Sequence, residues 1–332
     1  MNPEHRASSR GVRVARLSGV LLTAALLLPA ILLAAPAETK PPAPPAPGAA
    51  PAAAQKPKDP ARELLDSGWQ EMRFANWPKA QEILEGAIDK CARREDKAEA
   101  IFALANLCQT RQPGADVPRA KTLYERVVRD YADTPATPWA HLTLARLADN
   151  PEYEKHRDVE TARRLYIEIM GRYPDHPAAD EAALRLGMSY LEKVGNTVEE
   201  DRGAAILENR LAARPDNFLA PLAHMMLGDL DQRRKKYREA VDHWVISDPG
   251  VTGITERAAL YYKIAWTAEN ELKDYALAAK WWDRLVTDAR HENRYYVAKL
   301  GAERCRRLLA ESPKPAASAT PAAPKPPEGG RP

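Results

Sequence analysis

Apolar residues recur every three or four positions along most of the chain between residues 61 and 310, with charged and polar residues between them. This period matches the 3.6 residues of an α-helical turn and predicts amphipathic helices. The alternating Val, Ile and Thr runs and the Asn-Gly turns that indicate strands and hairpins are missing from this stretch of sequence. The pattern therefore predicts an all-α body over residues 61–310.

The predicted helices form a repeat, because the sequence resembles itself when it is displaced by 41 residues, with Tyr173-Pro174-Asp175 falling on Arg214-Pro215-Asp216. One small residue recurs in the first helix of each unit and another recurs in the helix that follows. The first series is Gly68, Cys108, Ala145, Gly187 and Gly228, with Trp266 as a poor sixth match. The second series is Ala80, Ala120, Ala162, Gly203, Ala240 and Ala278. The two series predict six helix pairs.

Small residues at these positions have a steric purpose, because two antiparallel helices approach closely only where both lack bulky side chains. A large residue follows the second small position by one helical turn in every unit and is expected to fill the next gap: Leu84, Tyr124, Tyr166, Leu207, Trp244 and Trp282. A single pair buries only one face, so the pairs must stack on one another. We expect a solenoid that ends in a capping helix.

The first 37 residues are typical of an export signal. Four arginines precede an uncharged run from Leu17 to Ala35, and Ala35-Pro36-Ala37 forms a small-residue cleavage pattern before Glu38. The run is also long enough to cross a bilayer at 1.5 Å per residue, so a cleaved signal and a retained N-terminal membrane anchor both fit residues 1–37. Either outcome places the rest of the chain outside the cytoplasm, in the periplasm or cell envelope.

Two segments rich in Pro and Ala flank the helical body, at residues 38–60 and 311–332. Their composition offers little apolar surface to bury and favours an extended polyproline conformation. We expect a linker before the body and a disordered tail after it.

The net charge is +3, but the way it is distributed along the chain argues against nucleic acid as a partner. Arg6, Arg10, Arg13 and Arg16 outnumber the single Glu4 in the first 37 residues, which accounts for the whole surplus. The remainder carries no net charge, whereas binding to phosphates requires clustered Lys and Arg. Contact with a membrane is expected only through the N-terminal segment, if it is not cleaved.

Chemistry-bearing motifs are missing from the sequence. It contains no GxGxxG, GxxxxGK[ST], GxSxG or HExxH, and its seven histidines lack the i, i+3 or i, i+4 spacing of a metal site. Cys108 occupies a small-residue packing position, which favours a buried and inert thiol over a bridge to Cys91. We therefore expect no catalytic residue, cofactor or metal.

The spacing of these residues resembles the tetratricopeptide repeat, which has a small residue at positions eight and twenty and an aromatic at position twenty-four. Leu227-Gly228, Tyr237, Ala240 and Trp244 match it best. The segment from Tyr173 to Tyr190 looks like the junction between repeats in bacterial envelope proteins of this class, such as the Tol-Pal coordinator and the outer-membrane assembly lipoproteins. The resemblance implies a right-handed superhelix of about six pairs.

The same resemblance implies that the first helix of each pair lines a concave groove that binds a protein or peptide. The family's groove positions, carried over residue by residue, select residues that are unusually apolar for a solvent-facing surface, and the candidate contacts among them are Trp69, Met72, Phe102, Trp139, Leu142, Met188, Leu191 and Met225. A large exposed apolar surface usually marks an interface. In the competing interpretation the longer turns rotate the helices, and Trp69, Trp139 and Leu184 belong to the core.

These observations predict an exported, non-catalytic scaffold of the bacterial cell envelope that binds a protein or peptide partner. Two alternatives remain: a helical-repeat part of an envelope enzyme that processes glycans, and an architectural homo-oligomer. A cleft with clustered polar groups of shifted pKa would favour the enzyme, whereas a long open groove would favour the scaffold.

Overall fold

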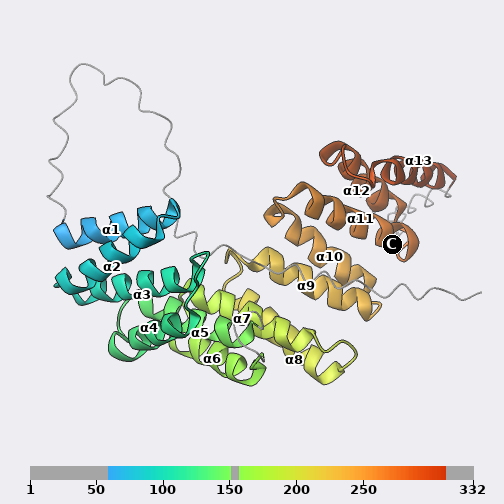
Figure 1. Cartoon of the computed structure of the whole chain (residues 1–332). Helices are drawn as coiled ribbons and strands as arrows, with labels where there is room; N and C mark the ends of the chain where they lie inside the picture. Colours follow the sequence, from blue (N-terminus) through green and yellow to red (C-terminus); the bar gives the residue numbers. More distant parts are fainter. Residues whose placement is uncertain (1–58, 151–156, 312–332) are drawn as a thin grey trace, which may run out of the picture. The chain divides into compact units, whose positions relative to one another are not determined.

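The computed structural model describes residues 59–150 and 157–311 (Figure 1). Within these ranges the chain forms thirteen α-helices and one short 3-10 helix, and no strand. The elements are α1 (Pro60–Arg73), α2 (Trp77–Lys90), α3 (Arg94–Thr110), α4 (Val117–Asp130), α5 (Ala136–Asp149), α6 (Val159–Arg172), α7 (Pro177–Leu191), α8 (Thr197–Ala213), α9 (Ala220–Arg233), α10 (Tyr237–Ser247), η1 (Asp248–Gly250), α11 (Ile254–Asn270), α12 (Tyr275–Asp288) and α13 (Tyr295–Glu311).

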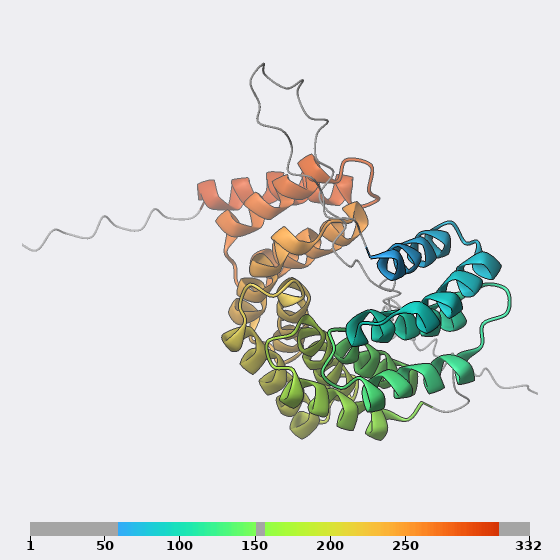
Figure 2. The same cartoon turned by 90° about the vertical axis from the view of Figure 1, so that its left-hand side faces the viewer.

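Each odd-numbered helix from α1 to α11 packs against the even-numbered helix that follows, and α13 packs against α12 as a cap. Each pair also contacts the next pair, so the helices stack in chain order, as the colours in Figure 2 show. The predicted all-α solenoid of six helix pairs with a capping helix is confirmed. We call the odd-numbered helices of the six pairs the first helices and their partners the second helices.

Four of the six second helices begin at polar residues whose side chains cap their free backbone N–H groups. The side chains of Asp116, Asp158, Asn196 and Asp274 each accept a hydrogen bond from the amide three residues later, at the start of α4, α6, α8 and α12. Short polar side chains are favoured at this position because the first four amides of a helix lack partners inside it. In these four hairpins the cap marks where the second helix begins.

The small residues lie where the helices of a pair come closest. A Cβ atom on Gly68 would lie 2.5 Å from Leu84 Cδ2, and one on Gly187 would lie 2.8 Å from Leu207. These distances are well below an ordinary carbon–carbon contact. The small residues of the second helices are at most 1% exposed: Ala80, Ala120, Ala162, Ala240 and Ala278.

Two positions of the first series need correction. The capping residues Asp158 and Asp274 donate their backbone N–H to the carbonyl oxygens of Ala148 and Ala268, as Asp116 does to Cys108. Ala148 and Ala268 are therefore the equivalents of Cys108, in place of Ala145 and Trp266. The sequence comparison missed this register because the turns between the two helices differ in length from pair to pair.

The body extends from α1 at Pro60 to the end of α13 at Glu311, close to the predicted range of 61–310. The predicted signal or anchor at 1–37, and nearly all of the linker at 38–60 and the tail at 311–332, lie outside the described residues. In the part of the chain that the structure describes, no helix is both long enough and apolar enough to span a bilayer.

Candidate interaction surface

Five of the eight predicted groove residues lie partly exposed on the first helices: Trp69, Met72, Trp139, Met188 and Met225. They come from α1, α5, α7 and α9. Partly exposed Trp and Met side chains offer a partner apolar area with little polar surface to desolvate. These five residues, which we call the accessible set, are the candidate contact residues.

The other three predicted groove residues are part of the core, which corrects the sequence-based assignment. Phe102 is 4% exposed, Leu142 is 1% exposed and Leu191 is 8% exposed. The reason is that successive first helices pack directly on one another, α1 on α3, α3 on α5, α5 on α7 and α7 on α9. Part of the surface that would have faced a groove is therefore used for contacts between repeats.

Helix α3 shows this most clearly, because all residues from Ala100 to Cys108 are buried. An α-helix that is apolar on every side belongs inside a protein. Its one polar residue in this run, Asn106, donates from Nδ2 to the carbonyl oxygen of Phe102 at 3.1 Å and lies 2.9 Å from the hydroxyl of Tyr124. This run, in which Asn106 is the one polar residue, was visible in the sequence and was the signal that Phe102 is core.

Ion pairs link successive first helices, a feature that the sequence analysis did not predict. Arg62 Nη1 on α1 lies 2.6 Å from Glu99 Oε2 on α3, and Arg146 Nε on α5 lies 3.8 Å from Glu181 Oε1 on α7. Further along the chain Lys263 Nζ on α11 lies 2.7 Å from Asp229 Oδ1 on α9. The partners are 34 to 37 residues apart, about one repeat, so each pair of charges fixes the register between neighbours.

Two carboxylates join three helices each. Asp229 accepts a hydrogen bond from Trp244 Nε1 at 3.0 Å as well as from Lys263. Glu269 accepts one from Trp282 Nε1 at 2.9 Å and another from Arg304 Nη2 on α13 at 2.9 Å. Burial alone would raise the pKa of Glu269, but the hydrogen bonds from Arg304 and Trp282 outweigh it and hold the pKa below its usual value.

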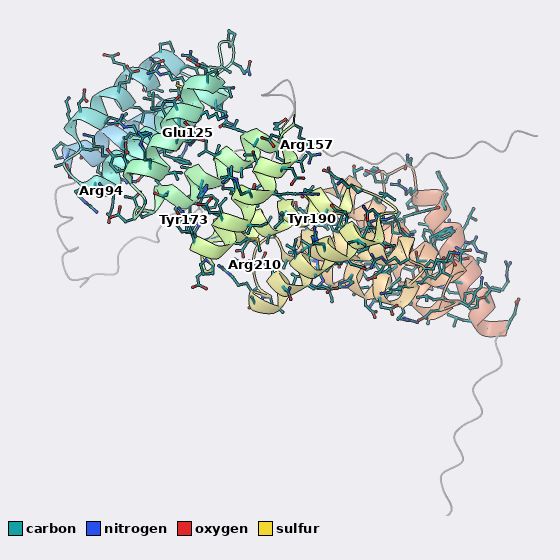
Figure 3. The ribbon with its side chains drawn as sticks, turned by 90° about the horizontal axis from the view of Figure 1, so that it is seen from below. Arg94, Glu125, Arg157, Tyr173, Tyr190 and Arg210 are labelled. Atoms are coloured by element: carbon teal, nitrogen blue, oxygen red, sulfur yellow. The ribbon has the colours of Figure 1, made fainter. Side chains whose placement is uncertain are left out.

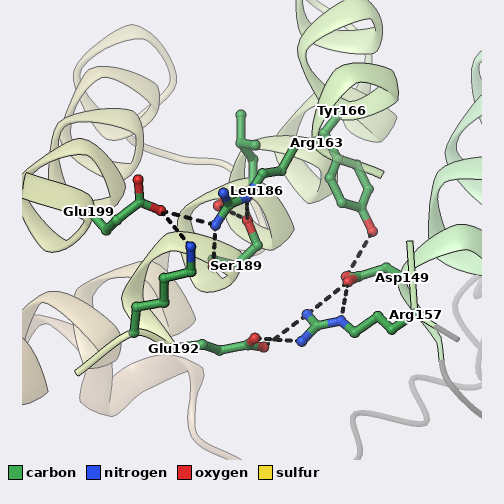
Figure 4. Close-up of polar contacts among 9 residues, drawn as sticks. Asp149, Arg157, Arg163, Tyr166, Leu186, Ser189, Glu192 and Glu199 are labelled. Atoms are coloured by element: carbon green, nitrogen blue, oxygen red, sulfur yellow. Dashed lines mark hydrogen bonds and ion pairs between the residues drawn. The ribbon is translucent and has the colours of Figure 1, made fainter. Parts of the chain in front are cut away.

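A polar seam connects the third pair with the fourth (Figure 4). Arg157 bonds Asp149 at 2.8 Å and Glu192 at 2.6 Å. The buried guanidinium of Arg163 donates to Ser189 Oγ at 3.0 Å and to its carbonyl oxygen at 2.6 Å, and it stacks over the ring of Tyr190 at 3.8 Å. Buried polar groups of this kind fix a junction because an unpaired group would be costly.

Arginines make similar contacts elsewhere along the body, and Figure 3 labels two of them, Arg94 and Arg210. Arg94 Nε on α3 lies 3.0 Å from Asp133 Oδ1 in the turn before α5. Arg210 Nε on α8 donates to the buried Asp180 at 2.7 Å, and its Nη1 donates to the carbonyl oxygen of Pro174 at 2.9 Å. These contacts are structural, because each arginine is engaged with its own chain.

Groups that could perform chemistry are scattered. In the described ranges no three or more His, Cys, Asp or Glu side chains gather as a metal site would require. Cys91, Cys108 and Cys305 are free and buried, and burial raises the pKa of all three thiols, that of Cys305 to about 11. A raised pKa disfavours the reactive thiolate.

One pair of histidines is brought together across two helices although the two are far apart in sequence. His224 Nδ1 on α9 lies 2.9 Å from His243 Nδ1 on α10, which requires one nitrogen to donate and the other to accept. Burial, and secondly the facing His243, lower the pKa of His224. Sequence spacing within one helix could not reveal this contact.

No protein-family profile and no curated protein matches the chain. Among solved structures, the chain is similar to pilF of Pseudomonas aeruginosa, with a TM-score of 0.50, 16% identity and coverage of 76% of this chain and 97% of that one. A tetratricopeptide repeat protein of Parabacteroides merdae has a TM-score of 0.44 and 17% identity, covering 76% of this chain and 87% of that one. The likeness to pilF shows the fold, so the predicted tetratricopeptide-like helical repeat is confirmed.

Proposed function

We propose that this chain is a non-catalytic scaffold of the bacterial cell envelope that binds a protein or peptide partner along its first helices. The observation that carries the proposal is the accessible set of Trp and Met side chains on α1, α5, α7 and α9. Solenoids of helix pairs commonly use extended surfaces of this kind for recognition. The partner would contribute apolar anchors that pack against these side chains.

The contact with the partner can be separated from the stability of the fold by mutation. Trp69→Ala, Met188→Ala and Met225→Ala should each weaken capture of the partner, because truncating an interface anchor typically costs about 2 kcal/mol or more of binding energy. Met188 and Met225 also pack partly against the core, so their variants should lose some stability, and capture is compared at a temperature at which every variant is folded. Ile167→Ala is the matched control, because Ile167 is 56% exposed on the second helix α6.

The assay is affinity capture from a membrane extract with the full chain as bait, followed by mass spectrometry and by melting curves of each variant. The proposal predicts a protein that is captured by the wild type and by Ile167→Ala and is depleted with the three first-helix variants. Undiminished capture by all three variants would place the binding surface elsewhere. A large fall in all three melting temperatures with intact binding would return these residues to the core.

The envelope location rests on residues 1–37, where arginines precede the apolar run and a small-residue cleavage pattern follows it. A reporter enzyme that is active only in the periplasm should be active when it is fused to the C-terminus of the full chain. Activity of a cytoplasm-only reporter at the same junction would contradict export. N-terminal sequencing of the mature protein then distinguishes cleavage before Glu38 from a retained anchor.

A further inference from the structure

The capping helix α13 has an apolar stripe on its outer side. Its inner side is buried against the preceding helices, and a Cβ atom on Gly301 would lie 2.7 Å from Trp282. On the outer side Tyr296 is 76% exposed, Leu300 is 60% exposed and Val297 is 49% exposed. The last unit of a solenoid normally needs a polar outer face to remain soluble. An apolar stripe at this position therefore indicates an interface.

The stripe continues into charged residues along the same side of α13. Tyr296, Leu300, Glu303 and Arg307 are spaced by four, three and four residues, so they line up along one side of the helix. Lys299 lies beside Glu303, one turn earlier. Lys299, Glu303 and Arg307 are exposed, and none of them has an ion-pair partner among the described residues. Their charges are thus available to another molecule.

The stripe is complementary to itself when two copies run antiparallel. A two-fold axis beside Gly301 brings Tyr296 opposite Arg307 of the second copy, at the same height along the helix. It also brings Glu303 and Lys299 of the second copy to the same side of the helix pair, about 1.5 Å apart along the helix axis. The two Leu300 side chains lie on either side of the axis, about 4.5 Å apart along the helix direction, which is close enough for them to touch. In this one arrangement Tyr296 faces Arg307 of the second copy, and Glu303 faces Lys299 of the second copy.

We propose that the chain forms a two-fold symmetric dimer in which α13 of one copy packs antiparallel on α13 of the other. The buried centre consists of the two Leu300 side chains, with Val297 at the edge. Two Lys299–Glu303 ion pairs and two contacts of Arg307 with Tyr296 flank it. A second copy is favoured over an unrelated partner because the aromatic and charged groups of the stripe are matched by residues of the same stripe.

The size of the stripe sets the strength of this dimer. A single helix pair covers less than the standard interface of about 800 Å² per partner. The dimer should therefore form reversibly and depend on concentration, in the micromolar range. The ion pairs lie at the solvent-exposed rim, so they should mainly set the direction and register of pairing.

The test measures the dissociation constant of the dimer by sedimentation equilibrium on the full chain in mild detergent. Leu300→Glu places two like charges at the axis, and Glu303→Lys places like charges beside Lys299. Each substitution should raise the dissociation constant at least about tenfold. The double variant Lys299→Glu with Glu303→Lys exchanges the two charges and should restore it to within about threefold of the wild type. Lys280→Glu, a charge reversal at an exposed position of α12, is the control and should have no effect.

Circular dichroism melts check that the variants are folded. We expect them to be folded because Leu300 and Glu303 are exposed. A wild type that stays monomeric at all concentrations would overturn the proposal. So would a dimer that withstands both single substitutions, or a double variant that fails to recover. A monomer in which deletion of residues 312–332 increases labelling of Tyr296 would assign the stripe to the chain's own tail and would likewise overturn it.

Discussion

The contact between Gly228 and Trp244 offers a direct test of the packing that holds a helix pair together. A Cβ atom on Gly228 would lie 2.6 Å from both Cδ1 and Nε1 of Trp244 and 3.0 Å from the carbonyl oxygen of Ala240. Trp244 cannot give way easily, because it is fully buried and its indole N–H is bonded to Asp229. The substitution Gly228→Ala should therefore force the two helices apart.

The expected cost follows from two opposing contributions. Alanine is favoured over glycine inside a helix by about 0.8–1.0 kcal/mol, which by itself would stabilise α9. Relief of the clash needs a shift of about 1 Å, since carbon atoms pack at 3.5–4.0 Å, and overpacking of this kind costs about 1–3 kcal/mol. Loss of the Trp244–Asp229 hydrogen bond would add about 1 kcal/mol. We expect a net destabilisation of about 1–3 kcal/mol.

The matched control is Gly86→Ala on α2, where a new Cβ would meet nothing within 4 Å. There only the helix preference of alanine remains, so this variant should be more stable than the wild type by about 0.5–1 kcal/mol. Urea titrations followed by circular dichroism measure both changes in the free energy of unfolding. If the two variants are equally stable, the close approach of α9 and α10 at Gly228 is not the constraint that we infer.

Two further outcomes can be measured in the same way. Phe102→Ala should cost about 3–5 kcal/mol of stability, the usual loss for a buried phenylalanine, while Met188→Ala costs clearly less; equal losses would contradict the burial assigned to α3. Burial lowers the folded-state pKa of His141, His176 and His224, so stability is complete above their unfolded pKa of about 6.5 and falls as the pH drops from there through the folded values. The melting temperature should fall between pH 7.5 and 5.5. If it falls by the same amount in the His224→Gln variant, the imidazole of His224 does not contribute to this pH dependence.

The helix pairs could be predicted from the sequence because their packing depends on residues close together in the chain. The four-residue spacing between Ala240 and Trp244 recurs in all six pairs, and the steric rule that links such residues is local. The register failed at Ala148 and Ala268, where the turn to the second helix differs in length from that of the second pair. A fixed spacing cannot follow such a change, whereas the cap bonds from Asp158 and Asp274 reveal it in the structure.

The candidate surface was less predictable because it depends on how successive pairs lie on one another. Whether Phe102 or Met188 faces solvent is decided by the neighbouring first helix, about one repeat away in the sequence. The same holds for the bond between Lys263 and Asp229, since neither residue has a local pattern that selects the other. Only the apolar run through α3 carried the information that part of the expected groove is core.

The double engagement of Asp229 and Glu269 has a mechanical consequence. Each carboxylate binds the tryptophan of its own pair and a cation of the next unit. A force that pulls on one unit therefore also acts on the carboxylate–tryptophan bond of the unit before it. Neither the fifth pair nor the sixth can be pulled open without loosening the helix that follows. Under a stretching force we therefore expect the units from α9 to α13 to open more cooperatively than neighbouring units that no such carboxylate links.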